Sequence, residues 1–371
     1  MLFQEIKRRL FTKYVLFSVI GILIITLGLN FMLIHDEREI NYNFQQEAFY
    51  EGDIKEDEVL VALKKVRDEK SEESRYTSQL YIINSLVNTY PGILYTENKV
   101  KDFPDKFAKD FYQCWKYKFE ALIKKLPSSQ QEIAKEKLNQ VKIPFKQYYG
   151  HQIYPFVLGN IQIIYMIIAF LVTFFAASTY SESFEDGSMD IIITTKFYKK
   201  NMFLRALPAI IYGVLLTIIT TLGTVFIISS KFGFKGLKSS FKMISLFSYG
   251  NFTIGQTILI MAIAEVIGVF ALSTVMGYLS LKLKKTTAVI AIGVGLNMFY
   301  IIVSKFMSFS TNLIKYLLNA IPISTHQVFI SMNEFSLGFR IWEPYEIMIE
   351  VLIVFIISFI ALTFAINRKE V

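Results

Sequence analysis

The chain has little of the residues that most often build covalent or metal-centred chemistry. Its 371 residues include one cysteine, Cys114, which excludes an intrachain disulfide. The three histidines, His35, His151 and His326, lie far apart and match no metal-ligand spacing. No Gly-Lys dipeptide occurs, so the phosphate-binding P-loop of ATPases is absent, and no protease or hydrolase signature is recognisable. We therefore expect a chain that is not an enzyme and has no cofactor or metal of its own.

Long apolar runs are what the sequence has in excess. Hydrophobic residues make up 53% of the chain and aromatic residues 15%. A bilayer core about 30 Å thick requires about 20 consecutive apolar residues per helix. Six runs reach that length, at about 14–34, 157–179, 206–229, 252–279, 287–308 and 345–366. The first run is too long for a signal-peptide core and has no small-residue cleavage site after it, so we expect it to be retained. The predicted fold class is an all-α integral membrane protein with six transmembrane helices.

Basic residues at the ends of the apolar runs indicate the orientation. They fall in four segments: Lys7, Arg8, Arg9 and Lys13; Lys196, Lys199, Lys200 and Arg205; Lys282, Lys284 and Lys285; Arg368 and Lys369. With six spans all four segments lie on one side, which the positive-inside rule makes the cytoplasm. We therefore predict a multi-pass protein of the cell membrane with both termini cytoplasmic. The net charge of +8 is then explained by anchoring to membrane lipid, and we expect no nucleic-acid partner.

One connection argues against this orientation. Lys231, Lys235, Lys238 and Lys242 follow the third run, on the side predicted to be outside. Aromatic and aliphatic residues alternate with these lysines. A short amphipathic helix on the outer surface would accommodate both types of residue, and this is what we expect there.

Residues 35–156 form the one long polar insertion between apolar runs. Both charge signs are frequent, glycine is rare, and the stretches 57–70, 73–90, 105–126 and 129–142 have helical apolar spacing. We predict a mainly helical extracytoplasmic domain over 35–156. The remaining divisions are a cytoplasmic amphipathic helix at 1–13, the first transmembrane helix at 14–34, and a five-helix transmembrane region at 157–371 with a cytoplasmic loop at 180–205.

The cytoplasmic loop has the most distinctive pattern in the chain. Acidic residues come first, a Gly-Ser step and an Ile191–Ile193 run follow, and hydroxyl and basic residues end it. Acid at the front and base at the back complement the macrodipole of a short helix. Such a helix would project into the cytoplasm, where it could insert into a groove of a partner. The candidate residues are Glu182, Glu185, Asp186, Gly187, Ser188, Asp190, Thr194, Thr195 and Lys196.

This pattern resembles the loop between the second and third spans of type-2 ABC transporter permeases. Lys196 stands where many members have proline, a variant typical of low-GC Gram-positive bacteria. The resemblance implies that the loop couples to a separate cytoplasmic P-loop ATPase, which binds the ATP, and that residues 1–13 form an elbow helix. It also implies a dimer with a second permease subunit, the same or different. The expected function is export of an amphipathic or apolar substrate, for example an antimicrobial peptide.

Two other functions and one plainer interpretation stay open. A secondary transporter would explain the spans, and a membrane receptor or scaffold would explain the large outside domain. The segment 182–200 could also be an amphipathic loop that lies on the bilayer without a partner.

Polar and small residues inside the spans are further candidates. Glu265, near the middle of the fourth span, either serves transport or makes a structural hydrogen bond in its protonated form. Asn297 of the fifth span is a candidate partner for it. Thr287, Ala291 and Gly295 recur at a spacing of four on the fifth span, which predicts close helix packing, either within one subunit or between two.

Overall fold

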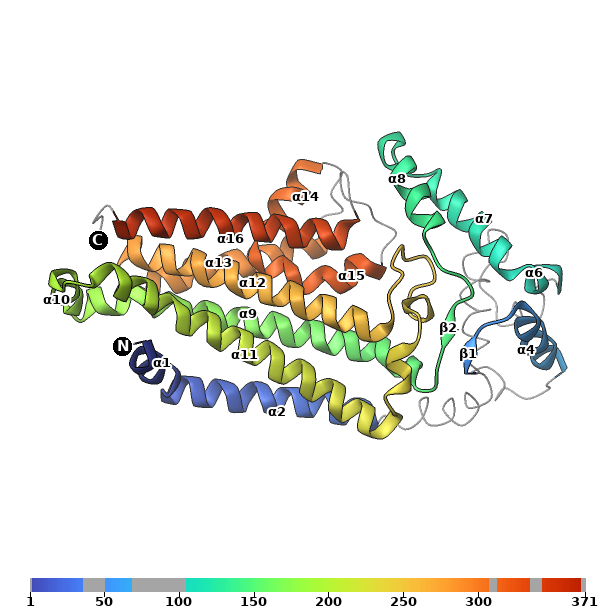
Figure 1. The fold of residues 1–371 in the computed structure, drawn as a ribbon, viewed down its shortest axis with the longest axis horizontal. Helices are drawn as coiled ribbons and strands as arrows, with labels where there is room; N and C mark the ends of the chain where they lie inside the picture. Colours follow the sequence, from blue (N-terminus) through green and yellow to red (C-terminus); the bar gives the residue numbers. More distant parts are fainter. Residues whose placement is uncertain (1, 36–50, 69–104, 307–311, 334–341, 368–371) are drawn as a thin grey trace.

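A computed structural model describes residues 2–35, 51–68, 105–306, 312–333 and 342–367 of the chain (Figure 1). Within these ranges, six helices are long and apolar enough to cross a membrane. They are α2 (Lys13–His35), α9 (Tyr154–Glu185), α11 (Tyr198–Phe232), α12 (Ile254–Leu283), α13 (Thr286–Phe306) and α16 (Glu343–Asn367). Each contains most of one predicted apolar run, so the prediction of a helical chain with six helices of membrane-spanning length is confirmed.

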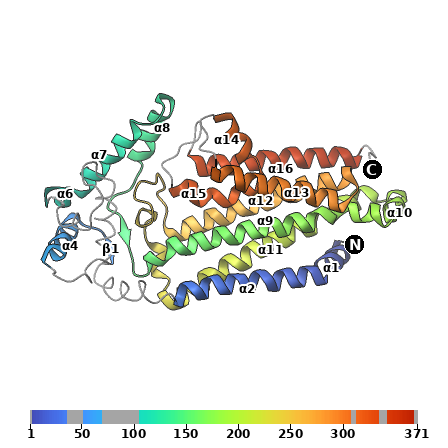
Figure 2. The same ribbon diagram turned by 180° about the vertical axis from the view of Figure 1, so that it is seen from behind.

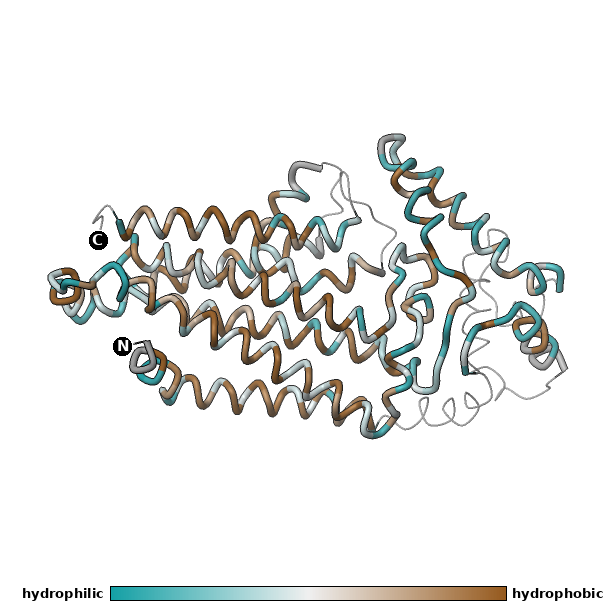
Figure 3. Tube along the Cα trace, in the orientation of Figure 1, coloured by the Kyte–Doolittle hydropathy of each residue, from teal (hydrophilic) through white to brown (hydrophobic). Residues whose placement is uncertain are grey.

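The long helices lie side by side in one bundle (Figures 1 and 2), and α12 packs against α9, α11 and α16. Figure 3 shows apolar residues along the length of the bundle and polar residues at its two ends. The start of α12 is fixed by a capping box. The Thr253 hydroxyl accepts from the Gln256 amide at 3.2 Å, and the Gln256 side chain accepts from the Thr253 amide at 2.9 Å.

The two ends of the bundle differ in what they carry. One end, which we call the α10 end, contains α1 (Leu2–Leu10), α10 (Ser188–Thr194) and the last residues of α16 (Figure 1). The opposite end, which we call the domain end, lies next to the small helices of residues 51–68 and 105–153. Three of the basic segments used for the orientation lie at the α10 end, and Arg368 and Lys369 lie outside the described residues. Which end faces the cytoplasm stays a prediction.

Short helices make up most of the described part of the polar insertion. They are α4 (Glu56–Asp68), α6 (Asp105–Lys109), α7 (Phe111–Ile123) and α8 (Ser128–Asn139), with the 3-10 turn η2 (His151–Ile153) before α9. β1 (Gly52–Asp53) and β2 (Lys146–Gln147) form an antiparallel pair in which Gly52 lies opposite Gln147. The predicted helical stretches 57–70, 105–126 and 129–142 coincide with these helices, whereas 73–90 lies outside the described residues.

The connection between α11 and α12 is not the amphipathic surface helix that the sequence suggested. It contains two 3-10 turns, η3 (Lys235–Lys238) and η4 (Phe241–Met243), with extended backbone at Ser239 and Ser240 between them. The Ser240 amide donates to the Lys146 carbonyl at 2.8 Å, and Ser240 also bridges to Thr253. These bonds hold the serines extended, so a continuous helix cannot form. Lys242, expected on the surface, is buried.

Residues 312–333, the described part of the connection between α13 and α16, pack into the bundle, which the sequence did not predict. They contain α14 (Asn312–Asn319), the 3-10 segment η5 (Pro322–Gln327) and α15 (Val328–Asn333). Residues 322–326 are all buried, and the Thr325 hydroxyl contacts Glu265 of α12. Glu265 lies 11 residues, or about 17 Å, inside α12 from its first residue. The described segment from α14 to α15 therefore packs into the bundle, and protein covers its irregular backbone at η5.

Candidate functional site at the α10 end

The predicted loop at 180–205 is mostly helix. Helix α9 continues to Glu185, α10 occupies Ser188–Thr194, and α11 begins at Tyr198. The turn from α9 into α10 is made by Gly187, whose φ of 73° lies in the left-handed region that favours glycine. Asp186 accepts a hydrogen bond from the Ser188 amide at 2.8 Å. Hydrogen bonding from Ser188 lowers the pKa of the Asp186 carboxyl. The candidate segment is therefore an ordered helical projection.

One face of α10 is buried against the spans. Met189 is 1% exposed. It belongs to a cluster of buried residues that also contains Tyr180 of α9, Met202 of α11, Leu281 of α12, and Leu362, Ala365 and Ile366 of α16. We call this group the α10 cluster. It connects the short helix with four of the long helices, so a displacement of α10 would act on all four.

The other face of α10 is exposed and mixed in character. We call the exposed residues here the α10 face: Asp190, Ile191 and Thr194 of α10, and Thr195, Lys196 and Phe197, which follow it before α11. Ile191 is 71% exposed and Phe197 is 60% exposed. The Thr194 and Thr195 hydroxyls bond to backbone carbonyls of α10 at 2.7 Å. Large apolar side chains among charges at the tip of a fixed helix suit contact with a protein partner.

Polar contacts next to α10 join the last turns of α9 to α11 and α12. The Tyr180 hydroxyl donates to the Met202 carbonyl of α11 at 2.8 Å. Arg205, also on α11 and 7% exposed, donates to the Ser183 hydroxyl at 2.5 Å. On α12, the Ser280 hydroxyl accepts from the Tyr180 amide at 3.0 Å. Sequence reasoning used Arg205 only for the orientation and gave the other residues no role, and the one signal for them was the presence of serines where an apolar run ends.

Three of the acidic candidates are engaged within the chain. Glu185 accepts from the backbone amide of Thr286 at 2.8 Å and from its hydroxyl at 2.9 Å, so it caps the start of α13. Glu182 lies 4.0 Å from Arg9 of α1, and Asp186 binds Ser188 as described above. Asp190 remains on the α10 face. The structure thus separates the nine candidates into two groups: five at the end of α9 and in the turn to α10, and four on the α10 face, namely Asp190, Thr194, Thr195 and Lys196.

Glu265 and Asn297 are both buried, but they do not bond to each other. The Thr325 hydroxyl of η5 donates to Glu265 at 3.3 Å. Asn297 donates instead to the Thr173 hydroxyl of α9 at 3.0 Å. The suggested pairing of Glu265 with Asn297 is therefore wrong. Each residue joins two different elements of the bundle.

The small-residue stripe on α13 faces outward. Thr287, Ala291 and Gly295 are exposed, and no described atom lies within 4 Å of where a Cβ on Gly295 would be. By contrast, a Cβ on Gly213 of α11 would lie 2.5 Å from a methyl group of Val269. Within the described residues, close packing therefore occurs at Gly213 and not along the α13 stripe.

Among the described residues, no group of three or more His, Cys, Asp or Glu side chains could hold a metal ion. Comparisons with known proteins found no match to the chain among protein-family models, curated proteins or solved structures. The functional argument therefore depends on the geometry of this chain and on its sequence pattern.

Proposed function

We propose that the chain is the membrane-spanning permease subunit of an ATP-driven exporter of the type-2 ABC class, whose ATPase is a separate cytoplasmic polypeptide. The single observation that carries the proposal is the two-faced character of α10. Ile191 on one face, and Phe197 just after the helix, are exposed and available for contact with a partner. Met189 on the opposite face is packed into the α10 cluster. A movement of a cytoplasmic partner bound to such a helix can be transmitted to α9, α11, α12 and α16.

In the proposed mechanism two permease subunits, the same or different, pair around the transport path. Two ATPases that close on ATP push the two α10 helices, and the spans reorient toward the opposite side of the membrane. The ATP is bound by the ATPase, so this chain needs no cofactor. The spans carry few charges and many Phe, Ile and Met residues, which favours an amphipathic or apolar substrate, with an antimicrobial peptide as one example.

The test is a pull-down of the tagged chain from its native membrane in mild detergent, with partners identified by mass spectrometry. The variant is Asp190→Lys with Ile191→Glu, because both residues lie on the α10 face. Glu182 and Glu185 are left unchanged because they contact Arg9 and cap α13. The matched control is Glu132→Lys, an exposed acidic residue of α8 at the domain end.

We expect a P-loop ATPase to be recovered with the wild type and the control, and to be lost from the double variant. Equal recovery with the double variant would remove α10 from the interface. Recovery of an intact chain without any ATPase would contradict the exporter proposal itself.

A second candidate, a secondary transporter, is favoured by one observation. Glu265 and the buried η5 segment place a carboxylate beside irregular backbone inside the bundle, next to one of the candidate spans. Intramembrane carboxylates often mark proton or ion pathways, and broken segments near the midplane are common in secondary transporters. The receptor or scaffold alternative assigns no role to α10 or to Glu265. Recovery of the ATPase distinguishes the exporter from both.

A further inference from the structure

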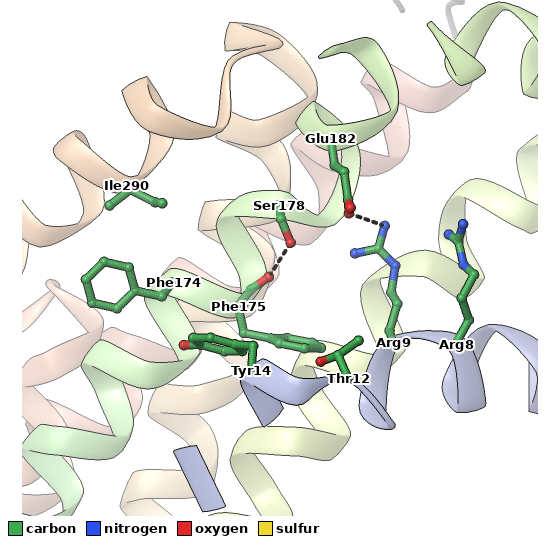
Figure 4. Close-up of a pocket in the computed structure, with 9 residues that line it drawn as sticks. All are labelled: Arg8, Arg9, Thr12, Tyr14, Phe174, Phe175, Ser178, Glu182 and Ile290. Atoms are coloured by element: carbon green, nitrogen blue, oxygen red, sulfur yellow. Dashed lines mark hydrogen bonds and ion pairs between the residues drawn. The ribbon is translucent and has the colours of Figure 1, made fainter. Parts of the chain in front are cut away.

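A cavity of about 450 Å³ opens at the α10 end, apart from the α10 face (Figure 4). Its walls come from α1, the start of α2, the last turns of α9, and Ile290 of α13. This volume lies within the range of about 300–1,000 Å³ that is typical of small-molecule sites. The cavity therefore has room for the headgroup of a lipid.

The polar side of the cavity is cationic. Arg8 and Arg9 of α1 line it, and among the described side chains of the lining Glu182 is the one acidic residue. Arg9 is 7% exposed and donates to the Thr179 carbonyl at 2.9 Å, which fixes its guanidinium group at the cavity wall. Arg9 also lies 4.0 Å from a carboxylate oxygen of Glu182. The planar donor fork of arginine matches phosphate geometry, so this side suits a phosphate group.

The rest of the wall is aromatic. Tyr14 and Phe175 stack with their ring centroids 6.3 Å apart, and Phe174 lies next to them along α9 (Figure 4). Tyr14 is 42% exposed and Phe174 is 40% exposed. These rings belong to α2 and α9, two of the candidate membrane-spanning helices. Aromatic side chains at the ends of spans lie at the level of lipid headgroups.

We propose that this cavity binds an anionic phospholipid from the leaflet at the α10 end. The lipid phosphate would lie against Arg8 and Arg9, and its glycerol and upper acyl chains would lie against Tyr14 and Phe174. The arginines suit a phosphate group and the aromatic wall suits an apolar group next to it. The cavity therefore favours an amphiphilic phosphate over one that is fully water-soluble. Basic pockets between membrane helices are known to bind anionic headgroups. The proposal does not depend on the exporter function.

The test uses native mass spectrometry of the full chain, purified in detergent and delipidated. The probes are phosphatidylglycerol, phosphatidylcholine with the same acyl chains, and inorganic phosphate. One variant, Arg8→Gln, removes an exposed cation, and another, Ser178→Phe, fills the cavity without changing charge. The matched control is Lys285→Gln, an exposed cation at the same end that does not line the cavity.

We expect phosphatidylglycerol to bind about tenfold more tightly than phosphatidylcholine, the effect of one good charge-assisted contact. Arg8→Gln and Ser178→Phe should each weaken phosphatidylglycerol binding by a similar factor, and Lys285→Gln should not change it. Equal binding of the two lipids, or unchanged binding in Arg8→Gln, would overturn the proposal. Displacement of the lipid by an equal concentration of inorganic phosphate would assign the site to a soluble phosphate instead. If Ser178→Phe does not fold, Arg8→Gln decides the outcome alone.

Discussion

At the scale of single residues, Glu265 offers the sharpest prediction about energy coupling. The Thr325 hydroxyl lies 3.3 Å from Glu265 and 3.1 Å from the Pro322 carbonyl. A hydroxyl has one hydrogen, so it cannot donate fully to both acceptors. The Thr325 hydroxyl, which is the donor in this structure, therefore satisfies each acceptor only in part, and a proton on Glu265 would allow the carboxyl group to donate to Thr325 instead. Glu265→Gln keeps a donor at this place but has no proton to release.

If ATP drives transport, Glu265→Gln should keep its transport rate and a melting temperature close to that of the wild type, because the amide keeps both a donor and an acceptor. The measurements are substrate transport in reconstituted vesicles and the melting temperature in detergent. A folded Glu265→Gln protein that no longer transports would favour the secondary transporter, because only that function requires the proton.

The importance of Glu265 could be predicted from sequence, whereas its partner could not. A carboxylate in an apolar run is conspicuous because burying it is unfavourable. Thr325 lies 60 residues further along the chain, in a segment without a span-length apolar run. Asn297 was suggested only because it is polar and lies in the next span. Hydropathy reports which residues are buried, but it carries no information on which buried residues meet.

At the scale of elements, the two faces of α10 should respond differently to truncation. Met189→Ala removes a buried side chain from the α10 cluster and should destabilise the protein by about 2–5 kcal/mol. Ile191→Ala removes an exposed side chain and should change stability by no more than about 0.5 kcal/mol. Under the exporter proposal Ile191→Ala should still weaken binding of the ATPase. Thermal unfolding and the pull-down measure the two effects separately. Equal stability of the two variants would argue against the packing of α10 on the spans.

The extent of α9 shows why element boundaries are difficult to predict here. The apolar run ends near residue 179, and Ser181, Glu182 and Ser183 then suggest a loop. In the structure Ser181 and Ser183 are buried, and their hydroxyls bond to Thr286 and Arg205. Hydrogen bonds between helices therefore extend α9 where hydropathy predicts its end. The short helix α10 forms where the acid-first pattern predicts one, but Glu182 and Glu185 belong to the end of α9, and of the acids only Asp186 and Asp190 lie at the start of α10.

Two glycines on different helices provide a second test at this scale. A Cβ on Gly213 would lie 2.5 Å from Val269 and 2.7 Å from Val172, so Gly213→Ala should cost about 1–3 kcal/mol through overpacking. A Cβ on Gly295 would meet no described atom within 4 Å, so Gly295→Ala should not lower the melting temperature. If the α13 stripe packs against a second permease subunit, Gly295→Leu should weaken the dimer. Cross-linking or native mass spectrometry of the purified protein measures that effect. A lower melting temperature for Gly295→Ala than for Gly213→Ala would contradict the assignment of the two surfaces.

At the scale of the whole molecule, the polar insertion and the spans meet through the α11–α12 connection. The Trp115 indole of α7 donates to the Leu246 carbonyl at 2.9 Å, and the Ser239 hydroxyl accepts from the Tyr148 amide at 2.8 Å. Phe119 packs edge-on against Phe247, with the ring centroids 5.7 Å apart. The sequence indicated a separate helical domain, but it did not indicate this contact because no local pattern encodes it. A movement of α11 relative to α12 would therefore reach the insertion directly.

Lys242 lies at the centre of this junction and should make its stability depend on pH. Its ammonium group donates to the Ser248 carbonyl and lies 5.7 Å and 5.8 Å from the ring centroids of Trp115 and Phe119. Burial lowers the pKa of Lys242 from 10.5 to about 7. The unfolded chain thus binds this proton more tightly than the folded chain does. This difference destabilises the folded chain. The loss of stability is complete below a pH of about 7 and becomes smaller as the pH rises toward 10.5.

We therefore expect the melting temperature of the wild type to rise from about pH 6 to about pH 9. Lys242→Met keeps an unbranched side chain without the charge. It should flatten this rise and should melt at a higher temperature than the wild type at the lower pH. The control is Lys238→Met, an exposed lysine of η3 with the same charge change, which should keep the wild-type slope. The measurement is thermal unfolding in one detergent, followed by tryptophan fluorescence. If the melting temperature changes with pH equally in the wild type and in Lys242→Met, the pKa of Lys242 is not lowered by burial. The aromatic rings and the Ser248 carbonyl would then stabilise the ammonium form, and the stability of the junction would not depend on pH.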